Sequence, residues 1–278
     1  MKFDFAKAYD FTGKCIVITG GAGILGGEMA KALLTCGADV VILDYNLTAA
    51  QKMVDSLKEI PGSSQALALQ TNVLDSGSVL AAVEAILSKF GKIDGLINGA
   101  GGNKPEATST PEKPFFDLPV DAIRWVFDLN LVGTIIPSQI VGRQMAKQKE
   151  GVILNVSSMN AFRPLTRIAA YSAAKAGVSN FTQWLAVYMA QEYSPKIRVN
   201  AIAPGFFLTD QNRFLLTDSE SGKLSKRGQQ IIDHTPMGRF GEPDDLSGTV
   251  LWLMSSASEF VSGIIVPVDG GFSAYSGV

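Results

Sequence analysis

The stretch CIVITGGAGILGG, residues 15–27, decides the fold of this chain. Its first five residues are mostly apolar and β-branched and predict a buried strand, and the glycines that follow predict a tight turn into a helix. Glycine lets the backbone approach a pyrophosphate closely, and a helix that starts there offers free N–H groups at the positive end of its dipole. A glycine-rich turn alone is weak evidence, because a strand–helix turn without a ligand has the same pattern.

Strand-like and helix-like segments alternate along the rest of the 278 residues. Apolar residues at helical spacing predict helices over Leu25–Cys36, Val79–Phe90 and Ala122–Met145. Several strand candidates are continuous apolar runs, which are typical of parallel strands buried on both faces. We therefore predict one α/β domain over residues 1–278, a Rossmann-type doubly wound parallel sheet of about seven strands with helices on both faces. The expected strands are Cys15–Thr19, Asp39–Asp44, Ala66–Gln70, Gly95–Asn98, Val152–Val156, Arg198–Ala203 and Ile264–Val268.

Two irregular, polar segments follow strands, at Gly101–Pro119 and Phe206–Pro236. Ligands of open α/β sheets bind at the carboxyl ends of the strands, and long loops there are more often functional than mere connectors. We interpret the second segment as an insertion that serves the substrate, over about residues 206–236.

Composition narrows the class of protein. The net charge is −2 and no basic run occurs, so nucleic acid and anionic membranes are poor candidates as partners. The chain shows no signal-peptide pattern and no uninterrupted apolar stretch of about 18 residues, which favours a cytoplasmic protein. Cys15 and Cys36 belong to no metal-spaced cluster and are expected to be free thiols. The single histidine, His234, argues against a histidine-rich site, so no metal is expected.

Asp44 ends the second predicted strand, 24 residues after Gly20. A carboxylate at this place accepts hydrogen bonds from the adenosine ribose of NAD and repels the additional phosphate of NADP. No lysine or arginine lies in Gly20–Gly27 or at positions 45 and 46 to bind that phosphate. The pattern favours NAD over NADP, and a helix N-cap or turn residue is the alternative role for Asp44.

The segment YSAAK puts Tyr171 and Lys175 four residues apart on an expected helix, so the two side chains share a face. A free tyrosine has a pKa of about 10 and is a poor base at neutral pH. A nearby ammonium, together with the positive nicotinamide of an oxidised coenzyme, lowers the pKa of a phenol and makes it a usable general acid or base. Surface residues at this spacing are common by chance, so the pair gains its meaning only from its context.

That context resembles the short-chain dehydrogenase/reductase family over nearly the whole chain. Ser158 ends the strand VILNVSS, 13 residues before Tyr171, and Asn130 lies in LNLVG. The resemblance implies that Ser158 polarises the substrate oxygen and that Tyr171 exchanges its proton. It also implies that Lys175 holds the nicotinamide ribose and lowers the pKa of the tyrosine, and that Asn130 helps to position a water molecule next to Lys175.

The same resemblance implies the coenzyme-binding residues. NGAG at 98–101 matches the motif beside the coenzyme, IRVNAIAPG ends at Gly205, and VDGG lies at 268–271. Two positions depart from the family pattern and alter local turns: the middle glycine comes one position early, at Gly23, and Gly99 stands where asparagine is common. The expected coenzyme-binding residues are Gly20, Gly23, Ile24, Leu25, Asp44, Asn72, Val73, Asn98, Ala100, Gly101, Tyr171, Lys175, Pro204, Gly205 and Thr209.

Polar side chains around the expected site indicate the class of substrate. A steroid or fatty-acyl pocket would be lined mainly by apolar groups, whereas here amides suit hydroxyl groups and guanidinium groups suit a carboxylate. The pattern favours a small polyhydroxylated acid, although each arginine has an alternative role in solvent or at a subunit interface. The expected substrate-binding residues are Asn103, Asn160, Arg163, Asn212 and Arg213.

The segments GGNKPEATS, SSMNAFRPLTRI, APGFFLTDQNRFLL and HTPMGRFGEPDDL resemble the D-mannonate oxidoreductase, or fructuronate reductase, branch of the family. This resemblance implies NADH-dependent reduction of D-fructuronate to D-mannonate. A gluconate 5-dehydrogenase-like enzyme, or another sugar-acid or polyol dehydrogenase, is the alternative. A non-catalytic NAD-binding protein on the same fold would be expected to lack Tyr171 or Lys175, and both are present.

Two features near the end of the chain remain open. We interpret His234 as a packing or capping residue, with contact to the substrate as the alternative. The apolar tail Gly271–Val278 is expected to pack on a neighbouring subunit of a homo-oligomer, a tetramer or a dimer, and simple fraying of the tail is the alternative.

Overall fold

A computed structural model describes residues 4–62, 64–208, 216–217 and 223–277 of the chain. Seven parallel strands form one sheet in the order β3-β2-β1-β4-β5-β6-β7. The predicted parallel sheet is confirmed, and each expected strand agrees with the structure to within one residue at either end. The strands are β1 (Cys15–Thr19), β2 (Asp39–Asp44), β3 (Ala66–Gln70), β4 (Gly95–Asn98), β5 (Gly151–Val156), β6 (Ile197–Pro204) and β7 (Ile265–Val268).

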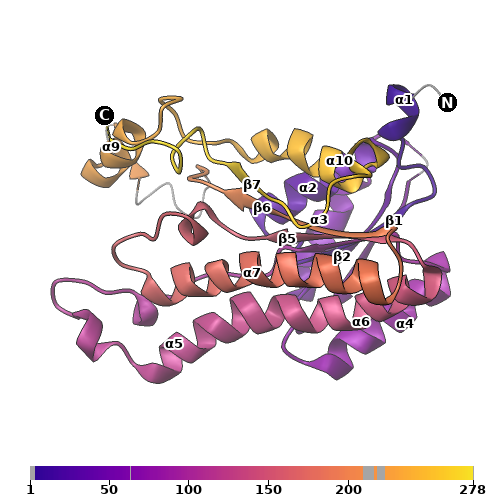
Figure 1. The fold of residues 1–278 in the computed structure, drawn as a ribbon, viewed down its shortest axis with the longest axis horizontal. Helices are drawn as coiled ribbons and strands as arrows, with labels where there is room; N and C mark the ends of the chain where they lie inside the picture. The colour runs from indigo at the N-terminus through magenta and orange to yellow at the C-terminus, as the bar shows by residue number, and fades with distance from the viewer. Residues whose placement is uncertain (1–3, 63, 209–215, 218–222, 278) are drawn as a thin grey trace.

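Helices cover both faces of the sheet, as predicted (Figure 1). One face carries α2 (Ile24–Thr35), α3 (Leu47–Leu57) and α10 (Ser247–Met254), and the other carries α4 (Ser76–Phe90), α6 (Gly133–Gln148) and α7 (Ala169–Glu192). The remaining helices are α1 (Phe5–Ala8), α5 (Val120–Phe127) and α9 (Lys226–Asp233). Within the described residues, no helix combines the length and the apolar character that crossing a membrane requires.

The sheet separates two hydrophobic clusters because successive side chains of a strand point to opposite faces. In β1, Ile16 and Ile18 pack with α2, α3 and α10, whereas Cys15 and Val17 pack with α4, α6 and α7. All five residues of β1 are buried. Each fully buried aliphatic side chain of this kind stabilises the fold by about 1.5–3 kcal/mol relative to leaving it exposed. The central strand is therefore fixed from both sides.

The helix predicted over Ala122–Met145 is formed, but it is not α-helical throughout. A π-helical turn, η3 (Asp128–Val132), separates α5 from α6 and contains Asn130. A π-turn holds one residue more than an α-turn, and the apolar spacing of the sequence does not reveal it. The segment Phe206–Pro236, predicted to be irregular, contains α9, whose N-cap Ser225 accepts a hydrogen bond from the Gly228 N–H.

A buried chain of polar side chains crosses one face of the sheet. The Asn98 amide nitrogen Nδ2 donates to Ser138 Oγ (2.9 Å) and to Asn155 Oδ1 (2.8 Å). Asn155 Nδ2 in turn donates to Thr182 Oγ1 (2.9 Å). These side chains are at most 3% exposed and bind one another, while the Asn98 Oδ1 has no hydrogen-bond partner among the described residues. This series of side-chain hydrogen bonds connects β4, β5, α6 and α7. The Asn98 amide fixes its direction, because its nitrogen is the donor to both Ser138 and Asn155.

We expect the substitution Asn98→Asp to lower the free energy of unfolding by roughly 3 kcal/mol. A carboxylate cannot donate to Ser138 or Asn155, and its charge would face the Asn155 amide oxygen at the centre of the protein. Denaturant unfolding at neutral pH measures the change. Asn46→Asp is the matched control, because Asn46 is an exposed helix N-cap and aspartate caps a helix equally well. Equal unfolding midpoints for the two variants would contradict the role given to the Asn98 amide.

Candidate active site

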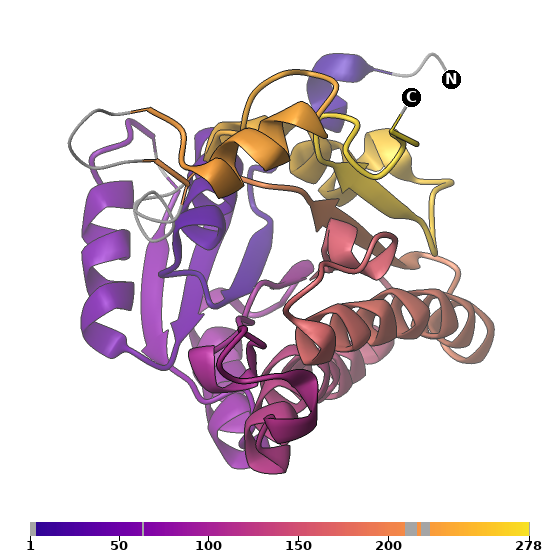
Figure 2. The same ribbon diagram turned by 90° about the vertical axis from the view of Figure 1, so that its left-hand side faces the viewer.

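Strands β1 and β4 are neighbours in the middle of the sheet, at the point where the strand order reverses. Ligands of doubly wound sheets bind at the carboxyl ends of the strands beside such a point. The segments that follow β4 and β5, together with α9, gather at one end of the molecule, on the left in Figure 1 and toward the viewer in Figure 2. This end holds the described residues that the sequence predicts for catalysis and binding.

The glycines after β1 form a cradle that larger residues would fill. Gly20 has a φ of +63°, and a Cβ atom there would lie 2.7 Å from the Ala100 Cα. A Cβ at Gly26 would lie 2.7 Å from the Gly20 carbonyl oxygen. Gly23 is the N-cap of α2 and supplies no side-chain cap, so the N–H groups of Ile24 and Leu25 have no partner within the helix. The loop therefore fits the pyrophosphate of a dinucleotide by shape and by its free donors.

Asp44 lies at the end of β2 beside this cradle. Its carboxylate accepts hydrogen bonds from the Ala22 N–H (3.2 Å) and the Asn46 N–H (3.0 Å). These bonds hold the carboxylate at the edge of the glycine-rich loop, where it is partly exposed. The arrangement fits a carboxylate that receives the ribose hydroxyls of an adenosine group.

The other predicted coenzyme residues occupy several strand ends. Asn72 follows β3, and its Oδ1 accepts from the Leu74 N–H (3.0 Å) beside the buried Val73. The Gly205 N–H after β6 donates to the Val268 carbonyl (2.9 Å). The Ala100 N–H donates to Thr19 Oγ1 (3.3 Å), and Pro204 ends β6. The side-chain amide of Asn98 belongs to the buried series of polar side chains described above. Thr209 lies outside the described residues.

Helix α7 brings Tyr171 and Lys175 together at the end of β5. The Lys175 ammonium nitrogen Nζ lies 5.6 Å from the centre of the Tyr171 ring and donates to the Val156 carbonyl (2.7 Å). Ser158 lies two residues beyond that carbonyl, and its Oγ accepts from the Asn160 N–H (3.3 Å). Because this N–H occupies a lone pair of Ser158, the hydroxyl proton is free to point at another oxygen.

Burial acts on both titratable groups of this cluster. Burial raises the pKa of Tyr171 above its usual value, and the Ser158 hydroxyl partly opposes this by favouring the phenolate. Burial lowers the pKa of Lys175 to about 8, since the ammonium has lost most of its water. The phenol is therefore protonated in the free site at neutral pH, and it needs a nearby positive charge before it can act as a base.

Asn130 shapes the loop after β4 from its π-turn. Its Nδ2 donates to the Gly102 carbonyl (2.7 Å), and its Oδ1 accepts from the Gly102 N–H (3.1 Å). A Cβ at Gly101 would lie 2.7 Å from Asn130 Oδ1 and 3.1 Å from Lys175 Nζ. The small residue at position 101 thus lets the asparagine and the ammonium approach the same point of backbone. The sequence did not indicate this clamp on Gly102, since nothing in the spacing of LNLVG shows which backbone the amide binds.

The residues predicted to bind the substrate differ in their burial and in their hydrogen bonds. Asn160 is 7% exposed, and its Oδ1 has no hydrogen-bond partner in the described part of the chain. Asn103 is exposed, and its Nδ2 donates to Thr108 Oγ1 (2.8 Å). Arg163 is exposed one turn beyond Met159, to whose carbonyl its N–H donates (2.9 Å). Asn212 and Arg213 lie outside the described residues.

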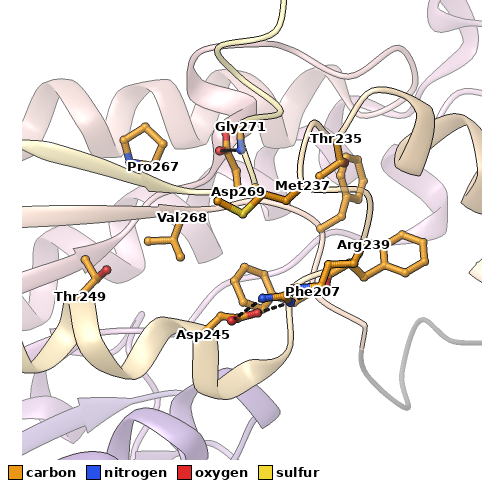
Figure 3. Close-up of a pocket in the computed structure, with 14 residues that line it drawn as sticks. Phe207, Thr235, Met237, Arg239, Asp245, Thr249, Pro267, Val268, Asp269 and Gly271 are labelled. Atoms are coloured by element: carbon orange, nitrogen blue, oxygen red, sulfur yellow. Dashed lines mark hydrogen bonds and ion pairs between the residues drawn. The ribbon is translucent and has the colours of Figure 1, made fainter.

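A cavity of about 430 Å³ lies beside this cluster at the ends of β6 and β7, and its lining does not include Ser158, Tyr171 or Lys175 (Figure 3). The Arg239 guanidinium on its wall binds the Asp245 carboxylate through two contacts, of 2.6 and 2.8 Å. This pairing lowers the pKa of Asp245 to about 2. The sequence analysis did not single out this cavity, because its wall comes from three separate stretches of the chain, at 206–207, 235–249 and 267–271.

His234 lies next to this region as the C-cap of α9. Its Nδ1 lies 2.8 Å from the Gln230 carbonyl oxygen, and its ring lies 6.5 Å from that of Phe272 and 6.4 Å from that of Tyr275. These contacts join α9 to the C-terminal tail and fit the interpretation of His234 as a packing and capping residue.

Comparison with known proteins places this chain in a family. A 45% identical relative covers 99% of this chain over 98% of its own length and is an uncharacterised oxidoreductase of Haemophilus influenzae. A 7α-hydroxysteroid dehydrogenase of Escherichia coli is 36% identical over 93% of this chain and 94% of its own. A crystal structure of a provisionally assigned D-mannonate oxidoreductase from Haemophilus influenza, with bound NAD, is 44% identical over 99% of this chain and 100% of its own, with a TM-score of 0.91. The family model for short chain dehydrogenases matches residues 14–220, and the chain belongs to this family of oxidoreductases.

Proposed function

We propose that this enzyme uses NADH to reduce D-fructuronate to D-mannonate, and catalyses the reverse oxidation. The observation that carries the chemistry is the meeting of Ser158, Tyr171 and Lys175 at the strand end beside the glycine cradle. A binding protein without turnover would have no use for a buried ammonium held against a phenol. The bound dinucleotide supplies the hydride that the protein's own side chains cannot provide.

The chain's residues hold and move the proton. The Ser158 hydroxyl, with its lone pair occupied by the Asn160 N–H, donates to the substrate oxygen. Tyr171 gives its proton to that oxygen during reduction and removes it during oxidation. Lys175, whose Nζ lies 5.6 Å from the centre of the Tyr171 ring, stabilises the resulting phenolate. Gly101 keeps the space at the ammonium open, and Asn130 fixes the adjoining peptide group of Gly102.

We propose NAD, rather than NADP, as the coenzyme. The Asp44 carboxylate is held at the edge of the cradle by two backbone N–H groups, where it accepts ribose hydroxyls and repels a phosphate. Tyr45 and Asn46, which follow it, carry no positive charge. The NAD bound to the similar Haemophilus influenza structure supports this choice.

A sugar acid is the substrate class that the polar groups support. Arg163 is exposed near Ser158 and has no ion-pair partner in the described structure, so its guanidinium is available to a carboxylate. By contrast, Arg239 is already neutralised by Asp245. The provisional assignment of the 44% identical structure supports D-mannonate. A 5-ketogluconate reductase, like the gluconate 5-dehydrogenases, is the second candidate, because the same polar groups suit it.

We also propose that the protein is a homo-oligomer in the cytoplasm. Helix α7 carries a ladder of aromatic rings on its outer surface, in which Phe181 and Trp184 stack at 6.3 Å, and Trp184 and Tyr188 at 4.9 Å. Trp184 is 57% exposed in the single chain, and such a surface is typical of a face that another subunit covers. Analytical ultracentrifugation decides between a monomer, a dimer and a tetramer.

The assay for the proposed reaction follows NADH absorbance with D-fructuronate, 5-ketogluconate, neutral D-fructose and a 7-oxo bile acid as alternative substrates. We expect fast turnover of D-fructuronate, and the substitution Tyr171→Phe should reduce it by at least about a hundredfold because the general acid is lost. Tyr188→Phe, on the exposed side of the same helix, is the control. Faster turnover of another ketone would show that D-fructuronate is not the preferred substrate. Near-normal turnover in Tyr171→Phe would refute the mechanism.

The substitution Asp44→Ala tests the choice of coenzyme. Without the carboxylate, the ribose hydroxyls lose their acceptor and the phosphate of NADPH is no longer repelled. We expect the ratio of kcat/KM for NADH to that for NADPH to fall by roughly tenfold or more. Asp55→Ala, which removes an exposed carboxylate of α3, controls for net charge. An unchanged ratio would show that another residue selects the coenzyme.

The buried Lys175 predicts a pH dependence of stability. Its pKa of about 8 in the folded protein lies below the ordinary 10.5, so the unfolded chain binds more protons between these values. Wild-type stability therefore gains with rising pH across this window, and Lys175→Met lacks that gain. We expect the free energy of unfolding of Lys175→Met, relative to wild type, to fall by about 2 kcal/mol from pH 7 to pH 10. Lys147→Met controls for the loss of one positive charge, and parallel curves for wild type and Lys175→Met would contradict the burial argument.

A further inference from the structure

Consecutive residues at the end of β5 contact α7 in register. Asn155 Nδ2 donates to Thr182 Oγ1 (2.9 Å), and the carbonyl of Val156 accepts from Lys175 Nζ (2.7 Å). Ser158 then interacts with the phenol of Tyr171. The contacted positions of the helix, 171, 175 and 182, recur on one helical face. The position of α7 along β5 therefore determines where Tyr171 and Lys175 lie.

Ser157 sits in the middle of this series and binds the turn of α7 that carries Lys175. Its Oγ lies 3.0 Å from the Lys175 carbonyl oxygen and 2.7 Å from Ser179 Oγ. A carbonyl only accepts, so the single proton of Ser157 goes to Lys175, and Ser179 must donate to Ser157. Ser157 is 2% exposed, so water does not replace these partners. The two serines thus form a directed hydrogen-bonded link between β5 and the catalytic turn.

We propose that Ser157 is a positioning residue of the reaction, which fixes the Lys175 turn of α7 against β5 and so keeps the Tyr171 phenol at the Ser158 hydroxyl. This inference rests on the proposed function for its reaction but not for its substrate. The contact of Lys175 Nζ with Val156 does not hold the helix, because the ammonium ends a flexible four-carbon stem. The bond from Ser157 to the Lys175 carbonyl acts on the helix backbone itself.

The consequence falls on the pKa of Tyr171. Tyr171 and Lys175 are the titratable groups of this cluster; burial shifts the pKa of both, and the Ser158 hydroxyl lowers that of Tyr171. Ser158, Asn130 and the two linked serines are polar but do not titrate in the ordinary pH range. If the turn that carries Lys175 moves away from β5, Tyr171 on the preceding turn moves with it and loses its alignment with the Ser158 hydroxyl, which favours the phenolate, so the pKa of Tyr171 rises.

The test measures the pKa of Tyr171 without any substrate. Phenolate absorbance is titrated in the wild-type protein and in Ser157→Ala, each against its own Tyr171→Phe counterpart, so that the difference isolates Tyr171. We expect Ser157→Ala to raise this pKa by roughly half a unit and to lower kcat by about five- to tenfold. Ser179→Ala should shift the pKa in the same direction by less, and it serves if Ser157→Ala does not fold.

Ser258→Ala is the matched control for a merely structural role. Ser258 is also buried, at 1% exposure, and its Oγ donates to the Trp252 carbonyl (2.6 Å), remote from α7. We expect this control to lose stability with an unchanged pKa of Tyr171. An unchanged pKa in Ser157→Ala, whether kcat falls or not, would overturn the proposal. A raised pKa in a protein that reduces none of the tested ketones would support Ser157 and refute only the proposed substrate.

Discussion

The close approach of two backbones, at Gly20 after β1 and Ala100 after β4, is the constraint on which the rest of this structure depends. Their positions leave no room for a Cβ at residue 20, and the positive φ of that glycine turns the chain into α2. The same approach brings the end of β4 within reach of Asn130 and Lys175. A side chain at Gly20 would push the glycine-rich turn after β1 away from the end of β4, which adjoins Asn130 and Lys175.

Burial shifts the pKa values of Tyr171 and Lys175 in opposite directions. It makes the Tyr171 proton harder to lose and the Lys175 proton easier to lose, so the isolated pair resists the charged state that proton transfer creates. Positive charge from the oxidised coenzyme can offset this resistance only when the coenzyme is bound. On the proposed function, the basicity of Tyr171 therefore depends on occupancy of the neighbouring glycine cradle.

Sequence patterns predicted the strands well because continuous apolar runs and glycine turns are local signals. The prediction of Tyr171, Lys175 and Ser158 rested instead on the resemblance to the family, because the spacing of a tyrosine and a lysine is common by chance. Asn98 shows the limit of this reasoning. Its position at a strand end suggests a coenzyme contact, yet the structure turns its amide toward Ser138 and Asn155, which lie 40 and 57 residues further along the chain. Such partners depend on tertiary packing, as does the link between Ser157 and Ser179.

The π-turn between α5 and α6 has a consequence for how this region can vary in evolution. An additional residue within a helix rotates everything beyond it by about 100° relative to the part before it. The π-turn at Asp128–Val132 therefore rotates α6 about its axis relative to α5. The two helices can then bury different faces while Asn130 binds Gly102. Loss of a single residue would rotate α6 by about 100° about its axis and would turn its buried Val141 and Met145 away from the sheet, so the length of this segment is constrained as well as the identity of Asn130.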